Sequence, residues 1–125
     1  KLAVKARRRS YSPYSRFAVG AALIANGQPV LGCNVENASY GGTICAERVA
    51  CLKAVSEGLT SISLIVVVAD GPRTVAPCGL CLQTLSEFCK PEMEVWLGDS
   101  RSLRARHLLK DLLPVAFGSQ DLSRR

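Results

Sequence analysis

The chain has little histidine and no long hydrophobic run. Its 125 residues include a single histidine, His107, so a metal site built from several histidines is excluded. His107 stands in a polar segment, and we do not expect it to be a metal ligand. The longest strongly apolar runs, residues 17–25 and 64–69, fall well short of the roughly 20 residues that cross a bilayer. No membrane association is expected.

A secretory signal is also missing from the first residues. Residues 1–10 are basic and contain no apolar stretch of the kind that directs export, so a cytoplasmic protein is expected. The length is typical of one domain and is sufficient for one hydrophobic core. We therefore expect residues 1–125 to form a single domain.

The formal net charge of +6 raises the question of nucleic-acid binding. The basic residues cluster only at the chain ends, in residues 7–9 and 124–125, and elsewhere they alternate with acids or lie on predicted helix faces. This distribution is typical of a solvated surface. No nucleic-acid partner is expected.

Six cysteines in a short chain allow either three disulfides or a metal site. The missing export signal and an apolar content of 48% argue against a disulfide-stabilised fold. Cys78 and Cys81 form a C-x-x-C, a spacing suited to metal binding. We therefore expect reduced thiols, some of which bind metal.

The first half of the chain predicts a helix followed by a β-hairpin. Apolar residues among Lys and Arg in residues 2–6 indicate an amphipathic helix that ends before the turn-rich residues 10–15. Residues 17–25 and 28–35 flank Asn26-Gly27, a dipeptide that favours a tight turn with two positive φ angles. A loop over residues 36–43 then leads to the next helix.

The second half alternates helices with strands. We expect helices over residues 45–57, ended by Gly58, and 78–89, ended by Pro91, with strands at 62–69 and 94–97. The run 62–69 is rich in β-branched residues, which predicts a central strand covered on both sides. Residues 103–113 are read either as a strand then a helix or as a helix alone. The pattern indicates an α/β fold, with helices on both faces of a sheet.

Cys45, Glu47, Cys78 and Cys81 predict a catalytic zinc site. Cys45 and Glu47 are two residues apart, so both side chains reach one ion only if they stand at the beginning of a helix. Cys78 and Cys81, three apart in a first turn, share a face. Three thiol ligands leave the fourth position for water, which distinguishes a catalytic zinc from a structural one. Glu47, otherwise a first-turn acid that stabilises the helix dipole, is placed to carry a proton.

Three thiolates around Zn²⁺ leave a net charge of −1, which a positive group must offset. Two helix N-termini supply part of it and lower thiol pKa values. Arg48 is the candidate side chain for supplying further positive charge. The alternative is that it is an exposed helix residue that only packs on its neighbours. Cys33, Cys51 and Cys89 lie within predicted strands or helices and are expected to be small core residues.

Several motifs together resemble the small homotetrameric, zinc-dependent cytidine deaminases. They cover most of the chain and are residues 14–23 (YSRFAVGAAL), 32–40 (GCNVENASY), 45–48 (CAER), 77–83 (PCGLCLQ) and 112–118 (LLPVAFG). The resemblance implies a three-layer α/β/α fold with a mixed five-stranded sheet and one Zn²⁺ per chain. It implies hydrolysis of cytidine or deoxycytidine to the uridine product and ammonia, in pyrimidine salvage, with Glu47 carrying protons.

The same resemblance assigns the substrate contacts. Asn34 and Glu36 match the residues that bind the ribose 3′-hydroxyl, although alone they are ordinary turn formers. Phe17 matches an aromatic residue against the base, and the amide of Ala46 matches a contact to the pyrimidine edge. Two further matches reach a neighbouring subunit's site, Tyr40 towards the sugar and Phe117 towards the base.

One position departs from the family pattern, and three other functions compete. Leu82 follows the C-x-x-C where the family usually has arginine, which leaves more charge compensation to Arg48 and suggests a core or subunit contact for Leu82. A deaminase of another small substrate, such as blasticidin S, is one alternative, but Asn34 and Glu36 favour a ribose pocket. A nucleic-acid cytosine deaminase would need more aromatic residues than one Trp provides. A non-catalytic zinc-stabilised module would need a fourth protein ligand.

Overall fold

The computed structural model describes residues 1–122, and Arg124 and Arg125 of the C-terminal basic pair lie outside the described residues. Its centre is a five-stranded sheet in the order β2-β1-β3-β4-β5. β3 pairs with β4 in parallel and every other neighbouring pair is antiparallel, so the sheet is mixed as expected. The strands are β1 (Val19–Ala25), β2 (Gln28–Cys33), β3 (Ile62–Ala69), β4 (Cys89–Gly98) and β5 (Leu103–Leu108).

The predicted hairpin forms where the Asn26-Gly27 dipeptide stands. Both residues adopt positive φ angles, 50° at Asn26 and 77° at Gly27, as a tight turn between twisted strands requires. The strands are shorter than predicted: β1 starts at Val19 and β2 ends at Cys33. The residues on either side of the hairpin are therefore loop, and they carry most of the predicted substrate contacts.

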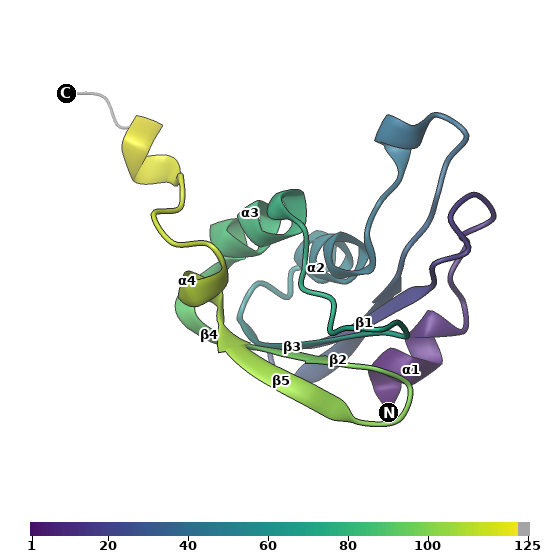
Figure 1. Cartoon of the computed structure of the whole chain (residues 1–125). Coiled ribbons are helices and arrows are strands. Elements are labelled where there is room, and N and C mark those ends of the chain that lie inside the picture. The colour runs from purple at the N-terminus through teal and green to yellow at the C-terminus, as the bar shows by residue number, and fades with distance from the viewer. Residues whose placement is uncertain (123–125) are drawn as a thin grey trace.

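One face of the sheet carries α2 (Ala46–Ser56) and α3 (Gly79–Phe88), as Figure 1 shows. α2 lies close to β2, because a Cβ atom on Gly32 would come 2.5 Å from both the Ala46 carbonyl oxygen and the Ala50 nitrogen. Small buried residues on α2, including Ala50 and Ala54, allow this approach. As predicted, the helix ends just before Gly58, which has a φ of 81°. Its N-terminus is thereby fixed against the hairpin.

The opposite face carries α1 (Leu2–Arg7), so helices cover both faces as expected. A Cβ atom on Gly20 of β1 would lie 2.1 Å from the Ala3 carbonyl oxygen, which places the backbone of α1 directly against this strand. Ala3 and Ala6 are buried in the contact. β3 is the central strand of the sheet, as its apolar sequence predicted.

The boundary between α3 and β4 differs from the prediction. The helix ends at Phe88, and Cys89 is the first residue of β4 instead of the last residue of a helix. Pro91 therefore lies in the strand and does not close the helix. The register of β4 against β3 is irregular between the pairs Ile62–Cys89 and Leu64–Glu94. A proline without an N–H is tolerated in such an irregular stretch.

The region after β4 contains both a strand and a helix. β5 pairs antiparallel with β4, and α4 (Leu109–Leu112) follows it directly, so the strand-then-helix reading of residues 103–113 is confirmed. Two short 3₁₀ helices, η1 (Tyr40–Gly42) and η2 (Ser119–Leu122), complete the elements. The segment after α4 projects away from the body of the molecule (Figure 1). Across the described residues, no helix has the length and apolar character needed to span a membrane.

Candidate metal centre

Three cysteine sulfurs meet at the N-termini of α2 and α3. Cys45 is the N-cap residue of α2, Cys78 is the N-cap residue of α3, and Cys81 lies in the first turn of α3. The Cys45 and Cys78 Sγ atoms are 3.9 Å apart, and the Cys78 and Cys81 Sγ atoms are 3.5 Å apart. All three sulfurs lie within 4.8 Å of one another. The sequence prediction that two helix N-termini converge here is confirmed.

These separations fit one zinc ion. Tetrahedral coordination with Zn–S bonds of about 2.3 Å requires sulfurs about 3.8 Å apart. In the described part of the chain, the cluster of His, Cys, Asp and Glu ligand atoms contains these three sulfurs alone. His107 lies on β5 opposite Val95 and does not belong to this cluster. The donor set therefore suits a single zinc with one coordination position left for a non-protein ligand.

The backbone explains why cysteine works at both helix starts. Cys45 and Cys78 have extended backbones, with φ of −71° at each and ψ of 155° and 171°, as N-cap residues usually have. In this conformation a side chain lies beside the first turn, where backbone N–H groups produce a partial positive charge. That charge favours thiolates over thiols.

Glu47 is buried beside the cluster. It lies in the first turn of α2 with only 5% of its surface exposed. Burial raises the pKa of its carboxyl group, and the negative charge on Cys45 raises it further. A buried acid with a raised pKa next to a metal site is more typical of proton transfer than of helix-dipole stabilisation.

Arg48 turns towards the sulfurs. Its Nη2 lies 3.6 Å from Cys45 Sγ and 3.4 Å from the carbonyl oxygen of Thr43. Arg48 Nε is buried and has no hydrogen-bond partner among the described residues. A hydrogen bond from Cys81, together with Arg48, lowers the pKa of Cys45 to about 5, and the same shared hydrogen bond raises the pKa of Cys81. The position of Arg48 thus suits charge compensation.

Replacing Arg48 by glutamine is expected to weaken zinc binding by about 10- to 100-fold, the usual effect of losing a hydrogen-bond partner of a metal ligand. The loss of the guanidinium raises the pKa of Cys45, so zinc must compete with a proton there. Competition with a chromophoric chelator at pH 7 measures the affinity. Arg9→Gln, at an exposed position, is the matched control. Equal affinity in Arg48→Gln and the wild type would contradict the role of Arg48.

Two of the predicted substrate contacts, Phe17 and Asn34, touch each other. Asn34 is buried, with 7% of its surface exposed, and its Nδ2 donates to the Phe17 carbonyl oxygen at 2.7 Å. Its Oδ1 accepts from the Val19 N–H at 2.9 Å and from the Ser10 hydroxyl. Much of the Asn34 amide is therefore used to fix the chain next to Phe17. The Phe17 side chain is exposed.

Glu36 lies in a pocket that the sequence reasoning had only partly identified. Its Oε1 accepts from the backbone N–H groups of Tyr14 and Ser15, at 2.9 and 3.0 Å, and its Oε2 accepts from the Ser15 hydroxyl. These bonds, the hydroxyl bond first, lower the pKa of Glu36. The Tyr14 and Tyr40 rings lie 5.9 Å apart and help to line a cavity of about 260 Å³. Tyr14 and Ser15 stand in the turn-rich residues 10–15 and begin the motif of residues 14–23, but no substrate contact was predicted for either of them from the sequence.

The remaining predicted residues lie at different depths. Ala46 is fully buried at the start of α2. Phe117 is exposed on the segment after α4, and its carbonyl oxygen accepts from Gln83 Nε2 of α3 at 2.9 Å. Leu82 is buried in the hydrophobic core, as its apolar stripe suggested.

All six cysteines carry free thiols. Cys51 is a core residue as expected, whereas Cys33 and Cys89 are only partly buried. Burial raises the pKa of Cys51 to about 11 and that of Cys89 to about 12, so both thiols stay protonated and unreactive at neutral pH. The structure thereby separates these thiols from the acidic Cys45.

The chain resembles proteins of one family over almost its whole length. Residues 1–96 match the family model described as the cytidine and deoxycytidylate deaminase zinc-binding region. A cytidine deaminase of Halalkalibacterium halodurans is 47% identical over 98% of this chain and 94% of its own. One from Sporosarcina psychrophila is 48% identical over 95% of this chain and 88% of its own.

Solved structures agree with the sequence matches. The crystal structure of cytidine deaminase from Burkholderia pseudomallei superimposes with a TM-score of 0.87 at 45% identity, covering 93% of this chain and 94% of that one. The Mycobacterium tuberculosis enzyme gives a TM-score of 0.81 at 40% identity, covering 94% and 92%. With sequence, fold and thiol cluster in agreement, the chain belongs to the cytidine deaminase family.

Proposed function

We propose that this protein catalyses the zinc-dependent hydrolytic deamination of cytidine and deoxycytidine to uridine and deoxyuridine, with release of ammonia. The observation that carries the proposal is the three-sulfur cluster with the buried Glu47 carboxyl group beside it. Cys45, Cys78 and Cys81 would hold the zinc, which supplies Lewis-acid activation of the attacking water. The near full-length similarity to cytidine deaminases supports the choice of substrate.

Glu47 is the proposed proton carrier. Deamination at C4 needs a group that takes a proton from water, delivers one to N3 of the base and then returns a proton to the departing amine. The raised pKa of Glu47 brings its acid and base forms closer in energy at neutral pH, which suits both directions of transfer. Its place on the first turn of α2, next to the sulfurs, keeps these transfers short.

The pyrimidine base would lie between Glu47 and Phe17. The backbone N–H of Ala46 would donate a hydrogen bond to the edge of the base. Support for Phe17 is its exposed ring at the end of a segment that Asn34 holds rigidly. Ala46 lies at the start of α2, where its N–H belongs to the first helical turn and has no partner within the helix. This N–H is proposed to donate to an acceptor on the base.

The ribose would occupy the cavity beside Glu36. The ionised carboxylate of Glu36 is a strong acceptor for a sugar hydroxyl, and Asn34 lies two residues before it in the chain. Tyr40, a residue 76% exposed, and Phe117, 57% exposed, are proposed to serve a neighbouring subunit's site in a homotetramer. Large exposed aromatic rings are typical of surfaces that a partner covers.

The protein is further proposed to act in the cytoplasm as a single catalytic domain. A nucleoside deaminase of this kind would act in pyrimidine salvage in the cytoplasm, and residues 1–125 would form one catalytic domain. Sedimentation velocity of the zinc-loaded protein tests the assembly. An active monomer would contradict the roles proposed for Tyr40 and Phe117 across subunits.

One assay tests the activity itself. Purified protein with one zinc per chain is expected to deplete the ultraviolet absorbance of cytidine and deoxycytidine and to release equimolar ammonia. Blasticidin S and single-stranded DNA, offered separately, test the competing substrates, and neither is favoured by the relatives named above. A zinc-loaded protein that leaves every nucleoside unchanged would refute the proposal and favour a zinc-stabilised binding module.

A further inference from the structure

The chain makes an unfavourable turn immediately before Phe17. Arg16 has a φ of 56°, in the left-handed region that residues other than glycine rarely adopt. Its N–H donates to the Ser12 carbonyl oxygen at 2.9 Å, which closes the turn. Such a conformation persists only where the surrounding structure holds it. The residues that hold the chain on the far side of Phe17 therefore matter for the orientation of its ring.

Asn34 holds this segment from the β2 side. Its side chain bonds the Phe17 carbonyl oxygen and the Val19 N–H, and its backbone N–H donates to the Val19 carbonyl oxygen at 3.2 Å. These bonds use the N–H of the Ala18–Val19 peptide group and leave its carbonyl oxygen, that of Ala18, to be satisfied from elsewhere.

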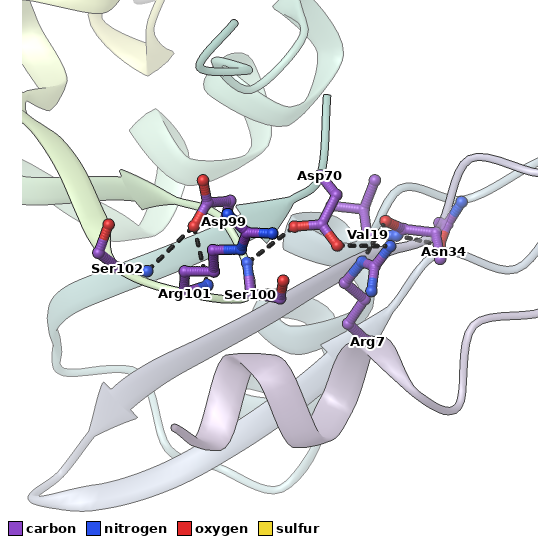
Figure 2. A network of polar contacts seen from close by, with 9 residues as sticks. Arg7, Val19, Asn34, Asp70, Asp99, Ser100, Arg101 and Ser102 are labelled. Carbon is purple, nitrogen blue, oxygen red and sulfur yellow. Dashed lines mark hydrogen bonds and ion pairs between the residues drawn. The ribbon is translucent and has the colours of Figure 1, made fainter. Parts of the chain in front are cut away.

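Arg7 satisfies it from the α1 side. Arg7 Nε donates to the Ala18 carbonyl oxygen at 3.0 Å, across eleven residues of sequence. Arg7 is the last residue of α1, and α1 is fixed to β1 by the close approach at Gly20. Figure 2 shows the Arg7 guanidinium near Val19 and Asn34. Arg7 and Asn34 thus hold the same Ala18–Val19 peptide group, Arg7 through its carbonyl oxygen and Asn34 through its N–H.

A carboxylate holds the other end of the guanidinium. Arg7 Nη2 lies 3.3 Å from Asp70 Oδ2, and Asp70 Oδ1 accepts from the Ser100 N–H at 2.8 Å (Figure 2). The exposed fractions of the Arg7 and Asp70 side chains are 27% and 42%, so the ion pair itself adds little stability. The same guanidinium thus contacts Asp70 through Nη2 and the Ala18 carbonyl oxygen through Nε.

We infer that Arg7 is a positioning residue for base binding, which sets the Phe17 ring through the Ala18 carbonyl group. Arg7 touches neither the metal cluster nor the cavity beside Glu36. This inference rests on the proposed function, because it gives Phe17 its role against the base. Loss of a charged donor that orients a binding group weakens substrate and transition-state binding equally, so it raises KM and leaves kcat nearly unchanged.

Arg7→Met is the direct test, since methionine keeps much of the apolar stem and removes both donors. We expect KM for cytidine to rise about five- to tenfold, with kcat within about twofold of wild type and one zinc per chain. Arg8→Met, at the exposed C-cap position of the same helix, is the matched control and is expected to keep the wild-type KM. Should Arg7→Met fail to fold, Asp70→Asn tests the same chain of contacts and is expected to raise KM by a smaller factor.

A double-mutant cycle separates positioning from a general loss of stability. If Arg7 acts through Phe17, adding Arg7→Met to Phe17→Ala raises KM by less than about twofold further. An independent readout without substrate is amide hydrogen exchange at Val19, which is expected to be faster in Arg7→Met than in Arg8→Met.

The outcomes that overturn the inference are specific. One is a wild-type KM in Arg7→Met. Another is a KM that Arg7→Met raises by the same factor in the wild-type and in the Phe17→Ala background. A third is an amide exchange rate at Val19 that Arg7→Met leaves unchanged. A wild-type protein that leaves cytidine intact refutes the proposed function instead. An active wild type whose Arg7→Met variant has unchanged KM refutes only the role of Arg7.

Discussion

Replacing Glu47 by glutamine is expected to lower kcat for cytidine by about 10³-fold, within the range that general acid–base groups usually contribute. Glutamine has nearly the same shape and fits the same buried position on α2, but it neither accepts nor delivers a proton at neutral pH. KM is expected to change much less than kcat, because the substrate contacts remain. Single-turnover ammonia release and steady-state kinetics measure both.

The matched control is Glu57→Gln, at the exposed C-cap position of the same helix, which is expected to retain full activity. Stability gives a second check. Because burial raises the pKa of Glu47 in the fold, the metal-free protein loses stability as the pH rises above the ordinary carboxyl pKa of the unfolded chain, and glutamine removes this penalty. The metal-free variant should therefore unfold at an equal or higher temperature than the metal-free wild type at pH 7. A Glu47→Gln protein with full kcat would eliminate Glu47 as the proton carrier.

Removing zinc is expected to abolish deamination and to lower the melting temperature by about 10 °C or more. A metal that binds only the folded state at about 1,000 times its dissociation constant stabilises that state by about 4 kcal/mol. In a domain of this size 1 kcal/mol corresponds to several degrees. Without the ion, the three thiols share one small site in which the pKa of Cys45 is lowered and that of Cys81 is raised. Dialysis against a chelator, followed by zinc titration with calorimetry and activity assays, measures loss and recovery.

Cysteine variants show whether the effect belongs to this cluster. Cys81→Ser is expected to lose tight zinc binding and activity, because Cys81 is fully buried and its sulfur lies within 4.8 Å of the other two. Cys33→Ala, a half-buried thiol outside the cluster, is expected to bind one zinc and retain activity. Activity that survives complete zinc removal would refute a metal-dependent reaction in this protein.

The elements predicted best were those set by local chemistry. Asn26-Gly27 specifies a turn with two positive φ angles, and the structure has both. The β-branched run of residues 62–69 became the central strand, since such a run buries both faces. Spacing also identified the thiol cluster, because residues three apart on a helix share a face whatever surrounds them.

Local chemistry misplaced the boundary between α3 and β4. Cys89 extends the apolar helical pattern of α3, and Pro91 is a strong helix terminator, so the sequence favoured a helix up to that point. In the fold, Cys89 instead pairs with Ile62 of the central strand. Tertiary pairing overrode the local preference, and the irregular register beyond Ile62 accommodates the proline.

What the sequence by itself determined is therefore the set of chemical groups and their local supports: three thiols, one carboxyl group and the helix starts that carry them. Only the tertiary structure decided that Asn34 fixes the segment after Phe17 and that Arg7 reaches Ala18. The reason is physical. Helical spacing and turn preferences act between residues a few positions apart, whereas the contacts of Arg7 and Asn34 join separate elements and exist only once α1 and the hairpin have packed together.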